Sequence, residues 1–161
     1  MKVPMKRNTN PPAKIDDIIS FEKEFNINLP QSYKKFLLEN DGGEIDESPN
    51  GLGMCSKFIN SSGEIMECYL SNFKSLIKIK ESLIHLLKRP DECFYLDECM
   101  KRGALIIGFE TQLEISIGIN EDNFGKVYRS NFTEAWNNNQ LQLISNTFED
   151  FINSFEEEED W

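Results

Sequence analysis

Residues 15–43 constrain the fold more than any other stretch, because they read as two short amphipathic helices joined by an elbow. The segment 15–25 spaces its apolar side chains for one helix face, namely Ile15, Ile18, Ile19 and Phe25. Pro30 suits the first turn of the next helix, where its missing N–H costs nothing. The second apolar stripe consists of Tyr33, Phe36 and Leu37. Gly42 or Gly43 can then adopt the left-handed conformation that ends a helix. The stretch therefore predicts a helical hairpin packed on a core.

The middle of the chain predicts a β-hairpin followed by a helix. Apolar segments at 54–59 and 64–73 flank the turn 60–63, which favours a hairpin. Residues 75–89 predict a helix that ends before Pro90. Its apolar face consists of Leu76, Ile79, Leu83, Leu86 and Leu87. In residues 91–100, acidic and aromatic side chains alternate irregularly, and we expect a further short helix or an ordered loop.

The clearest strand signals come late in the sequence. Residues 104–109 are continuously apolar, as expected for a strand covered on both faces. Residues 113–119 alternate, so we expect the isoleucines to face inward and Glu114 and Ser116 to face outward. A turn at 120–125 precedes a third strand at 126–129. Residues 147–155 predict a closing helix capped by Thr147, with a buried face of Phe148, Phe151, Ile152 and Phe155. The fold class is therefore α+β, a single domain with an antiparallel or mixed sheet packed against several helices.

Several short motifs in residues 15–43 occur together at a spacing that resembles the SUKH superfamily. They are Phe21-Glu22, Leu29-Pro30, Tyr33-Lys34, Phe36-Leu37 and Asn40-Asp41-Gly42-Gly43. The Gly-Lys-Val strand at 125–127 and the Thr-Phe-Glu start of the last helix are similar to the same family. The resemblance covers about residues 15–155 and is weakest between 44 and 103. It implies a Smi/Knr-like fold at 14–155, which leaves 1–13 as a flexible lead-in and 156–161 as an acidic tail that we expect to be frayed.

The net charge of the chain indicates which kinds of partner it can attract. The formal net charge is −11 and the sequence pI is about 4.6, so the chain repels nucleic-acid backbones and anionic membranes. A basic protein would be attracted instead, although high net charge also serves solubility alone. No apolar run approaches the roughly 20 residues that span a bilayer, and the charged N-terminus lacks the apolar block of a secretory signal. We expect a cytosolic protein.

Metal, cofactor and catalytic sites are not expected from the residue patterns. Cys55, Cys68, Cys93 and Cys99 form no Cys-x-x-Cys pair, and a single histidine makes a Cys/His metal cluster improbable. We expect free thiols and no cofactor. His85 falls on a polar helix face, which disfavours a histidine-based catalytic triad. The acidic turn at 120–123 lacks the register of a calcium-binding loop. These observations favour a binding protein over an enzyme.

The resemblance implies two kinds of binding function. Many bacterial members are immunity proteins of polymorphic toxin systems, and fungal members regulate cell-wall assembly as interaction scaffolds. The first reading predicts a basic toxin domain, such as a nuclease, as the partner. This chain has little sequence beyond the expected domain, which weakens the scaffold reading. Carboxylates could occupy positions where a nuclease holds phosphates. The candidate partner-binding residues are Glu44, Asp46 and Glu47, and Asp91, Glu92, Phe94, Tyr95, Asp97 and Glu98; Glu156–Asp160 is a further acidic cluster.

Overall fold

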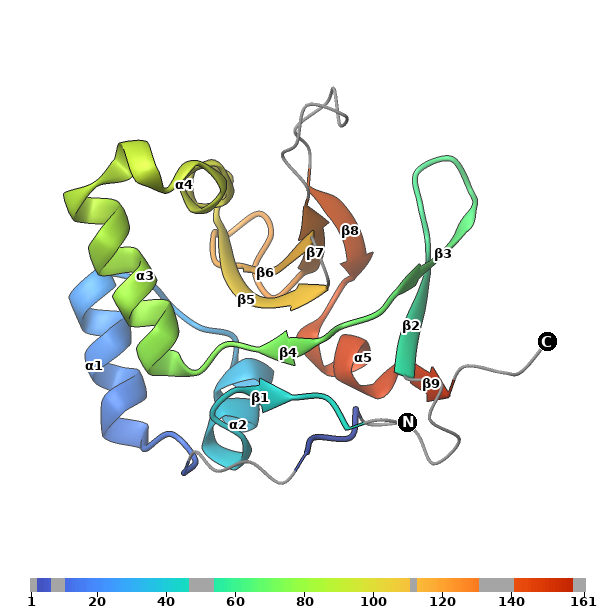
Figure 1. Cartoon of the computed structure of the whole chain (residues 1–161), viewed down its shortest axis with the longest axis horizontal. Coiled ribbons are helices and arrows are strands. Elements are labelled where there is room, and N and C mark those ends of the chain that lie inside the picture. Colours follow the sequence, from blue (N-terminus) through green and yellow to red (C-terminus); the bar gives the residue numbers. More distant parts are fainter. Residues whose placement is uncertain (1–2, 7–10, 47–53, 111–112, 131–140, 158–161) are drawn as a thin grey trace.

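The computed structural model describes residues 3–6, 11–46, 54–110, 113–130 and 141–157. Within these ranges the chain forms one α+β domain of five α-helices, one short 3-10 helix and nine strands (Figure 1). The helices are α1 (Ile15–Phe25), α2 (Gln31–Glu39), α3 (Leu76–Lys88), η1 (Pro90–Glu92), α4 (Phe94–Lys101) and α5 (Phe148–Asn153). The strands are β1 (Gly43–Glu44), β2 (Met54–Ile59), β3 (Ile65–Cys68), β4 (Asn72–Phe73), β5 (Ala104–Glu110), β6 (Leu113–Gly118), β7 (Val127–Ser130), β8 (Gln142–Ser145) and β9 (Phe155–Glu157).

The strands form two sheets, and every strand pair in the described residues is antiparallel. The larger sheet has the order β1-β4-β5-β6-β7-β8, and the smaller has the order β3-β2-β9. The predicted hairpin is confirmed as β2 and β3, whose register pairs Ser56 with Cys68 and Ile59 with Ile65. We predicted from the sequence that residues 64–73 form one arm of that hairpin. This prediction is wrong for the last residues of the segment. After Cys68 the chain leaves the small sheet, and β4 instead pairs with β5.

The main core contains buried residues of the large sheet, of the small sheet and of the helices α1, α2, α3 and α5. Its centre is a cluster of aromatic rings contributed by three separate segments. The Phe36 ring centroid lies 4.6 Å from that of Phe73, and the Tyr33 centroid lies 5.1 Å from that of Phe148. Edge-to-face contacts of this kind add to the free energy gained from burying the rings. All four predicted apolar residues of the closing helix region are buried, so that prediction is confirmed.

The orientations of α1 and α3 differ in part from the sequence prediction. Ile15 and Ile19 are 51% and 54% exposed, whereas Ile18 and Phe21 are buried. The large ring of Phe21 sets the rotation of α1, because burying an aromatic side chain removes more apolar area from water than burying an isoleucine. On α3 the predicted stripe holds at Leu76, Ile79 and Leu83. It fails at Leu87, which is 75% exposed because the helix extends beyond the core there.

The prediction that β6 has one outward face is also corrected. Ser116 is completely buried and Glu114 is half-buried. The reason is that α4 packs over the second face of the sheet, where Cys99, Ala104 and Ile106 form a small separate cluster. A strand that is covered on both faces can still alternate apolar and polar residues in sequence when only a small cluster packs on its second face. Ser116 Oγ has no hydrogen-bond partner among the described residues.

The described parts of both chain ends, residues 3–6 and 155–157, contact the rest of the domain. Val3 is buried, its N–H donates to the Ile152 carbonyl at 2.6 Å, and Met5 bridges to Ile45. The closing helix stops at Asn153 instead of Phe155, and β9 then pairs with β2. Glu156 and Glu157 of the predicted frayed tail therefore lie in a strand. In the part of the chain that is described, no helix combines the length and the apolarity needed to cross a bilayer.

Candidate partner-binding surface

The helix α4 presents an exposed aromatic pair. Phe94 and Tyr95 are 51% and 43% exposed, and their rings meet edge to face with centroids 5.6 Å apart. Elsewhere on α4, Cys99 is buried and Leu96 is partly buried against the sheet. The helix therefore packs on the sheet while both aromatic side chains stay exposed. Exposed aromatic residues next to a packed helix are typical anchors of protein interfaces.

The predicted acidic cluster around α4 is largely balanced by cations of the same region. Glu92 forms an ion pair with Arg89, and its other oxygen lies 3.2 Å from His85 Nε2. Asp97 Oδ2 lies 2.7 Å from Lys101 Nζ. Spacing of i,i+3 and i,i+4 brings such side chains together, so cations of the same segment neutralise part of the charge of these candidate partner-binding residues. Asp91 remains exposed beside these pairs.

Glu98 is the most strongly paired carboxylate of this cluster. Its Oε2 accepts a hydrogen bond from Arg102 Nη1 at 2.6 Å, and its Oε1 lies 3.5 Å from Lys101 Nζ. The Arg102 hydrogen bond holds the pKa of Glu98 below its usual range. Glu98 is therefore ionised at neutral pH, but its charge is already paired with the guanidinium of Arg102. A partner would have to displace that guanidinium or share the carboxylate with it.

The structure does not bring the other predicted acidic residues to α4. Glu44 lies in β1, on the opposite side of the molecule (Figure 1), and pairs with Lys6 at 3.0 Å. Asp46 is exposed nearby, with its N–H donating to the Pro4 carbonyl. Glu47 lies outside the described residues, as do Glu158, Glu159 and Asp160 of the C-terminal cluster. The predicted acidic residues thus form separate surfaces.

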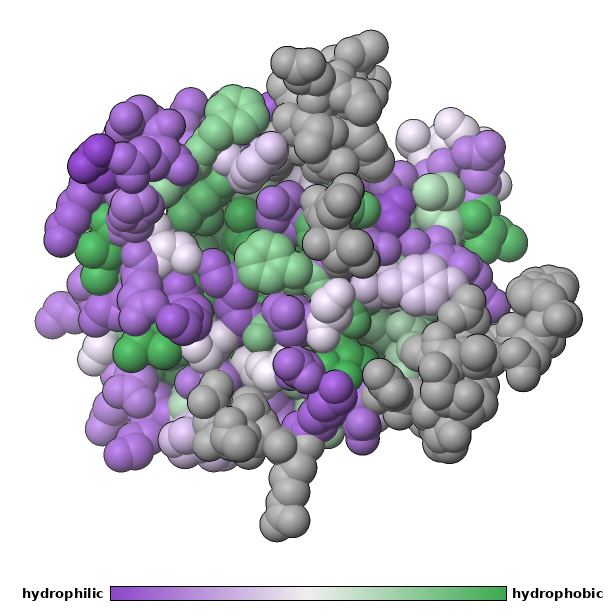
Figure 2. Space-filling view, in the orientation of Figure 1, coloured by the Kyte–Doolittle hydropathy of each residue, from purple (hydrophilic) through white to green (hydrophobic). Residues whose placement is uncertain are grey.

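A groove of about 410 Å³ runs between α3, α4 and the neighbouring face of the large sheet. We call it the α3–α4 groove. In the orientation of Figure 1, Figure 2 shows hydrophobic surface beneath α4 within a mostly hydrophilic face. Residues that line the groove include Lys74, Ser82, His85, Cys93, Phe109 and Glu114. His85 is exposed and paired with Glu92, as the sequence predicted for a surface residue.

Lys74 and Glu114 are the two titratable groups of the groove with perturbed pKa values. Lys74 Nζ donates to Ser82 Oγ at 2.7 Å and lies 5.7 Å from the centre of the Phe109 ring. Burial, and then the charge of Lys78, lower the pKa of Lys74. Burial raises the pKa of Glu114, and a backbone hydrogen bond of its own opposes the rise. Low local polarity therefore makes both charges more costly than they would be in water.

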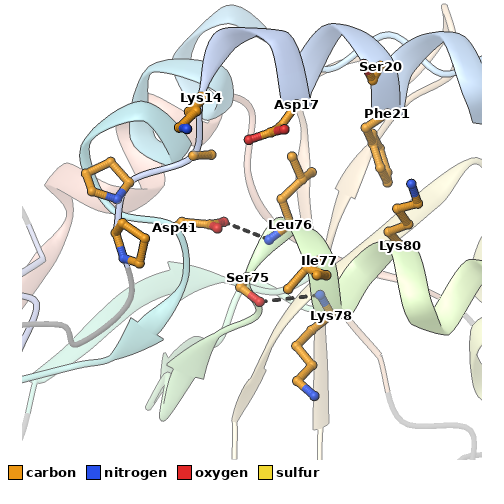
Figure 3. Close-up of a pocket in the computed structure, with 13 residues that line it drawn as sticks. Lys14, Asp17, Ser20, Phe21, Asp41, Ser75, Leu76, Ile77, Lys78 and Lys80 are labelled. Carbon is orange, nitrogen blue, oxygen red and sulfur yellow. Dashed lines mark hydrogen bonds between the residues drawn. The ribbon is translucent and has the colours of Figure 1, made fainter.

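A second pocket, of about 520 Å³, lies between α1 and the start of α3 (Figure 3). Asp41 Oδ1 accepts the Leu76 N–H at 2.7 Å, and Ser75 Oγ accepts the Lys78 N–H at 3.3 Å. These two bonds satisfy N–H groups that the first turn of a helix leaves without intrahelical partners. Asp17 reaches into the same space from α1 (Figure 3). The Asp41 bond therefore holds α3 to the loop that follows α2, whereas the Ser75 bond caps α3 from its own N-cap residue.

Comparison with known families decides how this domain is classified. The model of the SMI1 / KNR4 family (SUKH-1) matches residues 12–154 of the chain. The chain belongs to the SUKH-1 family. No curated protein matches its sequence significantly. The resemblance noted from the Leu29-Pro30 to Gly42-Gly43 run is thereby confirmed, and the α+β domain described above is consistent with it.

Sequence reasoning missed the α3–α4 groove of this SUKH-1 domain. Lys74 lies just before α3, while Phe109 and Glu114 pair across β5 and β6. A β-bulge between Ile106 and Gly108 places Phe109 on the same face as Glu114. The only sequence signal was Glu114 within an alternating strand, and we interpreted it as an outward residue. Within the described residues of the SUKH-1 domain, no group of three or more His, Cys, Asp or Glu side chains could hold a metal ion.

Proposed function

We propose that this SUKH-1 protein is an immunity protein that binds a cognate toxin domain and neutralises it without catalysing a reaction. The observation that carries the proposal is an exposed aromatic pair, Phe94 and Tyr95, on a rigid domain with a net charge of −11. Rigid aromatic anchors supply much of the binding free energy at protein interfaces. The family resemblance supplies the class of partner, a toxin of a bacterial polymorphic system, and the cytoplasm as the place of action.

Charge then favours a basic toxin, a nuclease being the clearest case. A nuclease needs Lys and Arg side chains to hold phosphates, and an acidic inhibitor competes for those side chains. Complementary net charge raises the association rate, up to about 10⁹ M⁻¹s⁻¹ at low salt. Near α4 the local carboxylates are mostly paired, so the overall charge of the domain supplies more of this attraction than the α4 cluster does.

Co-expression with the toxin domain encoded next to this chain tests the proposal. We expect the wild-type protein to restore growth of a bacterial host that expresses the toxin. The double variant F94A/Y95A should lose this protection, whereas I15A, which truncates an equally exposed apolar residue on α1, should keep it. Host cells that die equally fast with and without the wild-type protein would refute the proposal for that pair.

Stoichiometry separates a binder from an enzyme. Purified wild-type protein should inhibit purified toxin with an endpoint at one molecule of inhibitor per molecule of toxin. An enzyme that modifies the toxin would inactivate many toxin molecules per molecule and would leave the toxin inactive after separation. Recovery of toxin activity after denaturing separation is the expected result. Substoichiometric, irreversible inactivation would contradict the proposed mode of action.

A further inference from the structure

The half-buried Glu114 carboxylate has no ion pair among the described residues of the chain. Glu114 lies on β6, paired with Phe109 of β5 on one side and Ser130 of β7 on the other. Of the cations near the groove, Lys74 donates to Ser82 and Arg102 donates to Glu98. Residues 131–140, which follow β7, contain no Lys or Arg in the sequence. Glu114 therefore differs from the paired carboxylates of α4.

A half-buried carboxylate without a cation is costly, because burial removes water and the backbone N–H of Glu114 compensates for only part of that loss. Burial accordingly raises the pKa of Glu114. A cation that entered the groove would recover this cost and would gain more from the interaction than it would at a fully exposed carboxylate. The groove therefore favours the binding of a positively charged group at Glu114.

The groove residues beside Glu114 favour one kind of cationic side chain. Phe109 is 36% exposed; its ring centre lies 5.7 Å from Lys74 Nζ, and it pairs with Glu114 across β5 and β6. The apolar side chains of Leu96 and Ile106 also line the groove. An arginine carries an apolar stem and a planar guanidinium that stacks on aromatic rings and forks onto carboxylates. Lys74 is held to Ser82 and therefore does not occupy the place beside Glu114.

We infer that the α3–α4 groove receives an arginine side chain of the basic protein partner, with the guanidinium on Glu114 and the stem against Phe109. This inference rests on the proposed function, because it names the chemistry that the toxin presents. It also explains how the domain selects a basic partner while the carboxylates of α4 are engaged with its own cations. Glu114 supplies one partly desolvated charge, without an ion pair in the described residues, within the α3–α4 groove.

The test uses N-acetyl-arginine amide and its uncharged isostere, N-acetyl-citrulline amide, in an amide-detected NMR titration of the full chain. We expect saturable shift changes at Phe109 and Glu114 with the arginine compound. Binding of the citrulline compound should be at least about ten-fold weaker, since it lacks the charge-assisted hydrogen bonds. Equal shifts with both compounds, no saturation, or shifts confined to other surfaces would overturn the inference.

Two variants of equal charge complete the test. E114Q should abolish the saturable shifts, whereas E121Q, which neutralises an exposed carboxylate in the turn after β6, should leave them unchanged. E114Q removes a half-buried unpaired charge, so we expect it to fold at least as stably as the wild type at pH 7, and thermal unfolding checks this. Arginine binding that survives E114Q overturns the inference. Failure of the wild-type protein to protect against the toxin, with arginine binding intact, would count against the proposed function alone.

Discussion

Arg129 and Glu110 form a buried ion pair at the junction of the two sheets. Arg129 Nη1 lies 3.4 Å from Glu110 Oε2, and the two side chains are 6% and 10% exposed. The same Nη1 donates to the Glu67 carbonyl of β3, and Glu110 Oε1 accepts the Tyr69 N–H. One guanidinium and one carboxylate thus connect β5 and β7 of the large sheet to the small sheet.

We expect R129M to lower the free energy of unfolding by about 3–5 kcal/mol, because it leaves the Glu110 carboxylate buried without its cation. Urea denaturation measures the change. The double variant R129M/E110Q should recover part of the loss, since no buried charge then remains unpaired. A loss of less than about 1 kcal/mol in the single variant would show that the pair does not hold the sheets together.

The carboxylate of Asp41 caps α3 from outside the helix, and this predicts an order of stabilities. D41A removes the acceptor of the Leu76 N–H, and it should lower the free energy of unfolding by about 1 kcal/mol. D41N keeps an amide oxygen as acceptor and should cost less. Equal costs for the two variants, measured by urea denaturation, would exclude a role for this hydrogen bond.

Asp41 also predicts a pH dependence. Burial raises the pKa of Asp41, the Leu76 N–H opposes the rise, and Asp17 adds to it. Because the folded-state pKa lies above the unfolded value of about 3.9, the stability gained from binding this proton is present at low pH. That stability is lost as pH rises through the folded pKa. The difference in unfolding free energy between wild type and D41N should therefore fall over that window and stay constant above it.

Charge reversal distinguishes local steering near α4 from the effect of net charge. D91K/E92K and E44K/D46K change the net charge equally, on surfaces far apart in the fold. If the toxin docks at α4, the first variant should slow association more and flatten its dependence on salt. Stopped-flow association rates at several salt concentrations measure this. Equal slowing by both variants would mean that only the overall charge matters.

The thiols predict a labelling order in the native protein. Burial raises the pKa of Cys99 to about 11, against a hydrogen bond with Ser130 that lowers it. Burial also raises the pKa of Cys68. Cys93 is only partly buried and lines the α3–α4 groove, so a thiol reagent at pH 8 should label it first, since thiolate and access control the rate. C93S should remove the fast phase; a fast phase that persists would contradict the order.

The candidate surface was only partly predictable from the sequence. The sequence placed Phe94 and Tyr95 among the acidic residues at 91–98, and the structure shows both aromatic side chains exposed on α4. The sequence of this segment did not reveal that Glu92, Asp97 and Glu98 are paired with cations one turn away. Composition counts charges, whereas side-chain geometry decides which of them face a partner.

By itself, the sequence determined the elements whose cause is local. The apolar period of 31–39, the Thr147 cap of α5, whose Oγ1 accepts the Asp150 N–H at 3.0 Å, and the apolar run at 104–109 each depend on near neighbours in the chain. Only the tertiary structure decided that β4 leaves the hairpin for the large sheet and that β9 returns to β2. It also decided that α4 covers Ser116 and leaves Glu114 without a cation in the described residues. Those outcomes depend on contacts between segments far apart in sequence. The free energy of such contacts depends on both segments and on their relative position, so no single segment predicts it.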